Sequence, residues 1–177
     1  EKPLFLQAGE LLRQAVMQEP EYAAAHAWFA FWQMFLVGQG WADNPPDVMA
    51  EAGRLAERAI MLDPQDAKAL TIAGHVRAFL YHRLDEAMEL HERALSLNPN
   101  LPLAWVLAGL AEAYLGRPAE AIARVHHARQ LSPFDPHGYF FDMALMLGHL
   151  LRREHAVVVE LAHRSIALNP SLTSTYK

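Results

Sequence analysis

Residues 102–133 read PLAWVLAGLAEAYLGRPAEAIARVHHARQLSP, and this stretch decides the fold. Two apolar, alanine-rich segments flank Gly116-Arg117-Pro118, a turn in which Pro118 suits the first position of the following helix. Pro133 closes the stretch, because proline cannot continue a helix. The stretch therefore predicts two helices joined by a short turn.

The same layout recurs along the chain of 177 residues. Prolines with spacings of 44, 35, 34 and 37 residues mark it: Pro20, Pro64, Pro99, Pro133 and Pro170. A small residue stands five positions before each of these prolines: Ala15, Ala59, Ala94, Ala128 and Ser165. Such a period is typical of helix-pair repeats, and small residues are needed where two helix axes approach within about 8–10 Å.

The repeat predicts an all-α chain of antiparallel helix pairs. The first helices of the pairs are expected at 22–37, 67–81, 102–115 and 136–151. The second helices are expected at 47–62, 84–97, 118–131 and 154–168. A lone second helix at 4–18 precedes them, and the start of a further helix follows at 173–177.

These residues resemble the tetratricopeptide repeat (TPR). The family's pattern is seen best in Trp105, Gly109, Tyr114, Gly116, Ala121, Ala128 and Pro133, and the segment 67–99 follows it nearly as well. The resemblance implies a right-handed α-solenoid, a TPR superhelix, in a single array over residues 1–177. Its parts would be the second helix of a truncated repeat at 1–20, full repeats at 21–65, 66–100, 101–134 and 135–170, and the start of a truncated repeat at 171–177. Because the chain opens and closes in mid-repeat, we expect it to be a fragment of a longer protein.

The repeat at 21–65 departs from the others through an inserted loop at 38–47, which is rich in glycine and proline. We expect Asp47 to cap the helix that follows this loop. The helix before the loop is apolar on every side, which indicates burial on every side. Two alternatives remain open: the loop with Trp41 folds back over this helix, or an aromatic patch of Trp28, Trp32 and Trp41 binds a partner chain.

In the resembled family, the first helices line a concave groove that receives peptides. The pattern projects the following residues into that groove: Phe31, Met34, Lys68, Thr71, His75, Phe79, Val106, Leu110, Tyr114, His137 and Phe140. A mostly apolar groove suits an amphipathic helix or a hydrophobic segment of a partner polypeptide. Alternatively, several of these residues pack only against neighbouring helices. Some members of the family hold a C-terminal carboxylate with lysine, arginine and asparagine side chains; here only Lys68 could take part, which makes such a clamp improbable.

Composition argues against several classes of protein. Hydrophobic residues make up 53% of the chain and cysteine is absent, which excludes a disordered chain and a disulfide-stapled scaffold. A net charge of -5 and scattered arginines disfavour a nucleic-acid-binding surface. No run of apolar residues suits a transmembrane helix. We therefore expect a cytoplasmic protein without a nucleic-acid or membrane partner.

Catalytic and metal-binding motifs are missing from the sequence. The ten histidines include no His-Glu-x-x-His run, and no cysteine is present to complete a zinc site. The adjacent His126 and His127 point to different faces of their helix. Neither a phosphate-binding glycine loop nor a nucleophile elbow occurs. We expect no catalytic residue, no metal, no cofactor and no enzymatic activity.

A narrower resemblance concerns the context of the chain. The order of residues after Pro20, the loop around Trp41 and the segment 131–136 are similar to repeat regions C-terminal to bacterial adenylate or guanylate cyclase domains. The same style occurs behind winged-helix domains of transcription regulators. Two functional hypotheses follow. The chain is a non-catalytic scaffold that binds a partner polypeptide in its groove, or it is a regulatory segment of a signalling protein that can form a homodimer.

Overall fold

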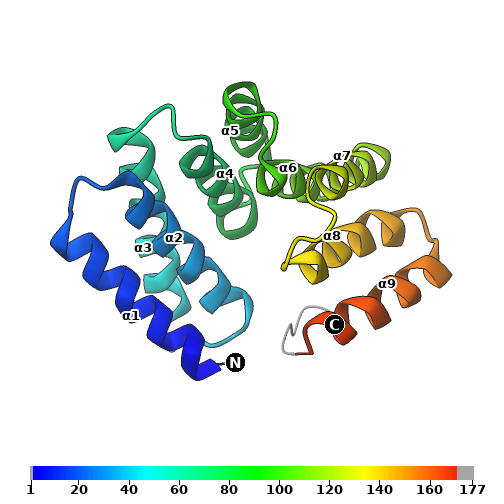
Figure 1. The fold of residues 1–177 in the computed structure, drawn as a ribbon, viewed down its shortest axis with the longest axis horizontal. Helices are drawn as coiled ribbons and strands as arrows, with labels where there is room; N and C mark the ends of the chain where they lie inside the picture. The colour runs from blue at the N-terminus through cyan, green and yellow to red at the C-terminus, as the bar shows by residue number, and fades with distance from the viewer. Residues whose placement is uncertain (1, 171–177) are drawn as a thin grey trace. The chain divides into compact units, whose positions relative to one another are not determined.

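The computed structural model describes residues 2–170, which form nine α-helices and no strand (Figure 1). In chain order the helices are α1 (Lys2–Gln18), α2 (Ala23–Gly38), α3 (Pro45–Leu62), α4 (Ala67–Tyr81), α5 (Leu84–Leu97), α6 (Pro102–Tyr114), α7 (Pro118–Leu131), α8 (Gly138–Leu151) and α9 (His155–Leu168). The predicted all-α fold of antiparallel helix pairs is confirmed.

Prolines and glycines explain several of the helix boundaries. Helices α3, α6 and α7 each begin with a proline, whose fixed φ suits the first turn. Gly116 follows α6 with a φ of 74°, a left-handed conformation that glycine adopts without strain. The predicted helix bounds agree with the structure to within two residues. The further helix predicted to start at 173–177 lies outside the described residues.

The predicted cap of α3 is wrong. The helix begins at Pro45, and Asn44 occupies the N-cap position without a capping bond from its side chain. Asp47 lies in the first turn of α3, where its carboxylate accepts a hydrogen bond of 2.5 Å from Asn44 Nδ2. Because Pro45 and Pro46 already have the φ of a first turn, the helix starts before Asp47 is reached.

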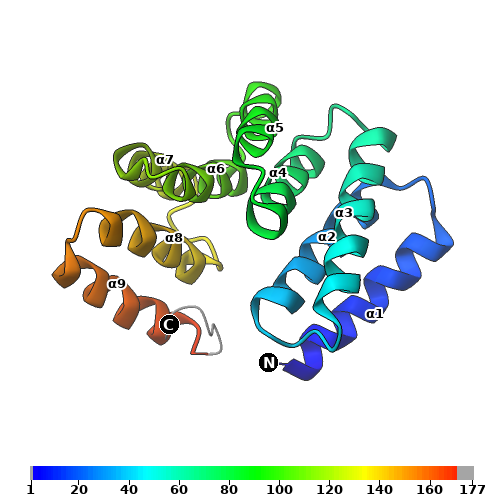
Figure 2. The ribbon, with the colours of Figure 1, turned by 180° about the vertical axis from the view of Figure 1, so that it is seen from behind.

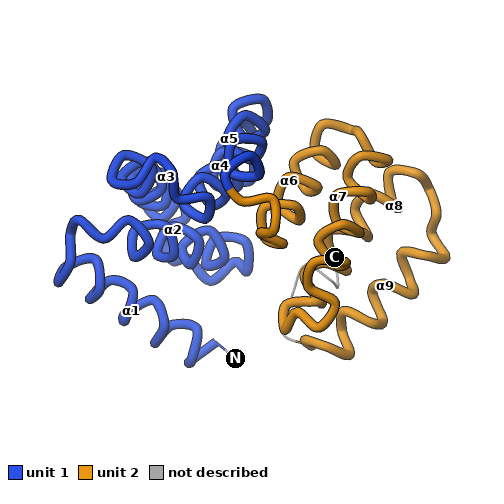
Figure 3. Tube along the Cα trace, turned by 45° about the horizontal axis from the view of Figure 1, so that its top comes forward, with its two compact units in different colours: residues 1–97 blue, residues 98–177 orange. Residues whose placement is uncertain are grey.

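Residues 1–97 form the first of two compact units and are described from residue 2 (Figure 3). Helix α2 packs against α1 and pairs with α3, while α4 pairs with α5 and packs against both α2 and α3. Helix α3 lies behind α2 in Figure 1 and in front of it in Figure 2. Buried alanines allow these helix axes to approach closely: Ala30, Ala52, Ala59 and Ala73.

Residues 98–177 form the second compact unit and are described to residue 170 (Figure 3). Helix α6 pairs with α7 and α8 with α9, while α8 also packs against α6 and α7. A Cβ atom on Gly109 would lie 2.9 Å from Val125 Cγ2, and one on Gly148 would lie 2.8 Å from Ile122 Cγ1. Small residues thus stand where these helices meet. The joining of all repeats into one continuous array stays a prediction.

Candidate functional site

One side of α2 is covered by α1. The 16 residues of α2 include no Asp, Glu, Lys or Arg, so every side of this helix can pack against apolar groups. Trp32 Nε1 donates a hydrogen bond of 2.7 Å to the backbone oxygen of Phe5, and the two rings stack with centroids 5.2 Å apart. A Cβ atom on Gly9 would lie only 2.2 Å from the Trp32 ring. Gly9 therefore makes the space in which Trp32 is held.

The inserted loop brings Trp41 to the same place. The Trp41 ring lies edge-on to Phe5 at 5.4 Å, and the Lys2 ammonium lies 5.6 Å from the Trp41 centroid. Trp32 and Trp41 therefore both contact Phe5 of α1, whereas the Trp28 ring contacts Phe31. The structure thus divides the three predicted patch residues between two groups of contacts.

The other side of α2 faces α4 and carries a row of aromatic rings. Trp28 lies edge-on to Phe31 at 5.7 Å, and Phe31 lies edge-on to Phe35 at 4.9 Å. From α4, the His75 ring lies 6.4 Å from Phe31 and stacks on Phe79 at 5.8 Å. We call this surface the α2–α4 aromatic face and define it by Trp28, Phe31, Phe35 and Phe79; His75 lies beneath it.

The aromatic face is partly open to solvent. Trp28 is 38% exposed, and Phe31, Phe35 and Phe79 are half-buried. The predicted groove residues Met34 and Thr71 are buried instead, and the Thr71 hydroxyl donates to the backbone oxygen of Ala67 at 2.7 Å. Met34 and Thr71 therefore lie beneath the surface and not on it.

His75 is an uncharged residue directly beneath the face. It is 3% exposed, and its Nδ1 atom has no hydrogen-bond partner. Burial lowers the pKa of His75 from 6.5 to about 3, because the charged imidazolium would lose its hydration. The ring therefore stays neutral at physiological pH and packs between Phe31 and Phe79 as an aromatic group.

Lys68 places a positive charge at one end of the aromatic face. It stands in the first turn of α4, where the carboxylate of Asp66 caps the helix by accepting from Lys68 N at 2.8 Å and Ala69 N at 3.3 Å. The Lys68 ammonium lies 5.8 Å from the Trp28 ring centroid, within range of a cation–π contact. Lys68 is exposed, and no carboxylate of residues 2–170 lies within ion-pair distance of it.

The predicted groove residues of the second unit are mostly interior. Val106, Leu110 and Phe140 are buried, and the first two are almost completely so. Tyr114 and His137 are exposed, and the His137 ring lies 6.0 Å from Tyr139. The partner-binding role of these residues stays a prediction.

Two buried acids in the second unit were not singled out from the sequence. Glu112 of α6 pairs with Arg117 and Arg124, each at 3.3 Å. Asp142 of α8 accepts two bonds from Arg164 of α9, from Nε at 2.8 Å and from Nη2 at 2.5 Å.

Arg129 of α7 completes the contacts of Asp142, so this carboxylate ties three helices together. Asp142 in turn raises the pKa of Arg164. The sequence feature that could have predicted these ion pairs is an acid inside an otherwise apolar helix, because a buried carboxylate needs partners.

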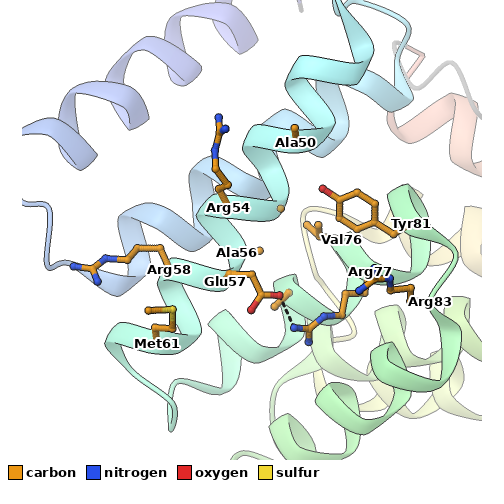
Figure 4. Close-up of a pocket in the computed structure, with 12 residues that line it drawn as sticks. Ala50, Arg54, Ala56, Glu57, Arg58, Met61, Val76, Arg77, Tyr81 and Arg83 are labelled. Carbon is orange, nitrogen blue, oxygen red and sulfur yellow. Dashed lines mark hydrogen bonds and ion pairs between the residues drawn. The ribbon is translucent and has the colours of Figure 1, made fainter.

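A cleft of about 540 Å³ lies between α3 and α4 (Figure 4). Its floor is apolar and includes Val76, and its rim carries Arg54, Arg58, Arg77 and Arg83. Each of these arginines has a carboxylate partner: Glu51, Glu21, Glu57 and Glu86, respectively. The rim is therefore close to neutral and does not select an anionic ligand.

Two further observations concern residues 2–170. No group of three or more His, Asp or Glu side chains there has an arrangement that could hold a metal ion. None of the helices in this part of the chain combines the length and the apolar character needed to cross a bilayer.

Comparison with known structures identifies the fold class. No protein-family profile matches the chain, and no curated protein matches it. TTC0263, described as a thermophilic TPR protein in Thermus thermophilus, matches in structure with a TM-score of 0.75 and 18% identity, over 97% of this chain and 87% of that chain. This chain has a TPR fold.

Two crystal structures of MamA match the TPR fold of this chain less closely. Their TM-scores are 0.56 and 0.57, each at 16% identity over 96% of this chain, and they are covered over 85% and 91% of their own lengths. At such identities the likeness concerns the fold and says nothing of a ligand. The context behind a cyclase or winged-helix domain stays a prediction.

Proposed function

We propose that this TPR-fold chain is a non-catalytic protein-interaction module that binds a partner polypeptide on the α2–α4 aromatic face. The observation that carries the proposal is the row of partly exposed rings on two neighbouring helices, one of which has no Asp, Glu, Lys or Arg. Aromatic side chains bury a large area with few rotatable bonds, and contiguous exposed apolar surface marks interaction sites.

The chemistry of the face favours a polypeptide over a small polar ligand. Trp28, Phe31 and Phe79 offer ring surface, and neutral His75 adds no charge. An apolar side chain of a partner can lie on these rings, as a helix laid in a groove or as an extended segment. We also propose a cytoplasmic location, as expected from the sequence. Binding on the aromatic face does not depend on that location.

The test compares two variants that each remove one exposed apolar side chain. Trp28→Ser alters the aromatic face, whereas Leu11→Ser alters α1, where Leu11 is 59% exposed. Tagged wild-type chain and both variants are used to co-purify bound proteins from cells of the source organism, after circular dichroism has shown equal helicity. We expect a specific polypeptide with the wild type and Leu11→Ser, and at least a tenfold loss, about 1.4 kcal/mol, with Trp28→Ser. Equal recovery with Trp28→Ser contradicts the proposal.

A second candidate function is self-association as a dimerising or regulatory segment of a signalling protein. It is favoured by α1, which leaves three large apolar side chains more than half exposed: Leu4, Leu11 and Met17. A dimer through α1 would cover Leu4 and Leu11, which lie seven residues apart on one side of the helix. Sedimentation at increasing concentration tests this candidate: a dimer that Leu11→Ser dissociates supports it, and a monomer at all concentrations excludes it.

A further inference from the structure

We propose that the partner segment carries an acidic side chain next to the apolar residue that lies on the α2–α4 aromatic face, and that this carboxylate pairs with Lys68. The inference rests on the proposed function and adds to it the charge of the partner. It follows from how the charged groups of the first unit are distributed around the aromatic face.

Lys68 is the unpaired charge of this face. Helix α2 has no Asp, Glu, Lys or Arg, and α4 has two cations, Lys68 and Arg77. Arg77 is directed to α3, where it pairs with Glu57 at 2.5 Å. Of the two, Lys68 alone has no carboxylate partner within the described residues, and its ammonium lies beside the exposed ring of Trp28.

The nearest acids in sequence are already engaged with the backbone. Asp66 Oδ1 accepts from the amide groups of Lys68 and Ala69, which caps α4. Asp63 Oδ1 accepts from Gln65 N at 3.0 Å within the turn before α4. Both carboxylates stabilise the turn, and neither pairs with the Lys68 ammonium. The exposed ammonium can therefore pair with a carboxylate of the partner.

Lys68 and Trp28 together define the spacing that a partner needs. An apolar side chain that lies against Trp28 brings its sequence neighbours to the Lys68 ammonium, which is 5.8 Å from the Trp28 ring centroid. An acidic neighbour gains an ion pair, whereas a basic neighbour meets a like charge. Because the pair is partly exposed to water, we expect it to change affinity by about two- to fivefold.

The experiment selects peptides from a random peptide library displayed on phage, with the purified full chain as the target. We expect the enriched peptides to carry Asp or Glu within one helical turn of an aromatic or aliphatic residue. Selection on Lys68→Glu should replace this acidic preference with Lys or Arg. The most enriched peptide is then synthesised with a fluorescent label, together with a version in which its acid is replaced by the corresponding amide.

Binding of the two peptides is measured by fluorescence anisotropy on wild type and two lysine variants. Lys68→Met should weaken the acidic peptide about two- to fivefold and leave the amide peptide unchanged. Lys2→Met is the matched control, because Lys2 lies over Trp41 at a similar distance from its ring, 5.6 Å, on the α1 side of the first unit. We expect no change for either peptide with Lys2→Met.

The outcomes separate the two proposals. Peptides that lose binding on Trp28→Ser but show no acidic enrichment, or that Lys2→Met weakens as much as Lys68→Met, overturn the inference and leave the proposed function standing. Peptides that bind Trp28→Ser as tightly as wild type, or a selection that enriches none, count against the proposed function itself.

Discussion

At the scale of single residues, His75 shows how a titratable group becomes part of an apolar cluster. The sequence placed it among the groove residues, but periodicity could not show that its ring would be enclosed by Phe31 and Phe79. Burial keeps the pKa of His75 at about 3, far below that of an exposed histidine. A histidine that must stay neutral in the folded chain makes the stability of the first unit dependent on pH.

The predicted pH dependence has a definite sign. Because the folded-state pKa of His75 is lowered from 6.5 to about 3, the unfolded chain binds a proton first as the pH falls. The stability that the packed, neutral His75 ring gives to the folded chain is therefore fully present above pH 6.5. It is lost progressively as the pH falls toward 3. Between about pH 7 and about pH 5, the free energy of unfolding should fall by about 2 kcal/mol more in wild type than in His75→Leu. Urea unfolding at the two pH values measures this; equal losses in the two proteins would refute it.

At the scale of helices, the positions of the helices along the chain could be predicted from the sequence. The neighbours that pack on each helix could be predicted less well. Proline spacing and small residues gave the helix bounds to within two residues, because these signals are local. The packing of α1 on α2 was not predicted, since periodicity shows that α2 is apolar all round but not which side each neighbour takes. Phe5 and Gly9 are the residues that decide it, because they enclose Trp32.

The contact between α1 and α2 predicts an unusual effect of a glycine substitution. Replacing glycine by alanine inside a helix normally stabilises it by up to about 1 kcal/mol. Gly9→Ala should instead lower the free energy of unfolding by about 1–3 kcal/mol, because the new Cβ atom overlaps the Trp32 ring. Gly138→Ala serves as the control, since its Cβ atom would meet Leu168 only at 3.9 Å. A stabilised Gly9→Ala variant would show that α1 does not dock as described.

The ion pairs of Asp142 give the second prediction at this scale. Asp142→Asn removes the charge that Arg129 and Arg164 share and leaves both cations without their buried partner. Because the arginines are partly exposed, we expect a loss of about 2–3 kcal/mol, somewhat less than for a fully buried pair. Glu89→Gln, an exposed acid-to-amide change on α5, should alter stability by less than about 0.5 kcal/mol. Chemical unfolding of both variants measures the difference, and similar effects would contradict the role of Asp142.

At the scale of the whole molecule, the fold could be predicted from the sequence and the candidate site only in part. The repeat determines the helix pairs, and a TPR fold follows from them. Of the predicted groove residues, Phe31, Lys68, His75 and Phe79 do meet around one surface, whereas Val106 and Leu110 are interior. The pattern could not separate these cases, because an apolar residue on a first helix has the same sequence signal whether it lies in the core or at the surface.

Photo-crosslinking can show whether a partner polypeptide lies on the α2–α4 aromatic face. A benzophenone amino acid replaces Phe79 on that face or, as the control, Met61 of α3, which is 69% exposed and lines the cleft between α3 and α4. Irradiation in cells of the source organism is followed by identification of the crosslinked chain. We expect a crosslinked partner from position 79 that Trp28→Ser abolishes, and none from position 61. A partner captured from position 61 and not from position 79 would contradict it.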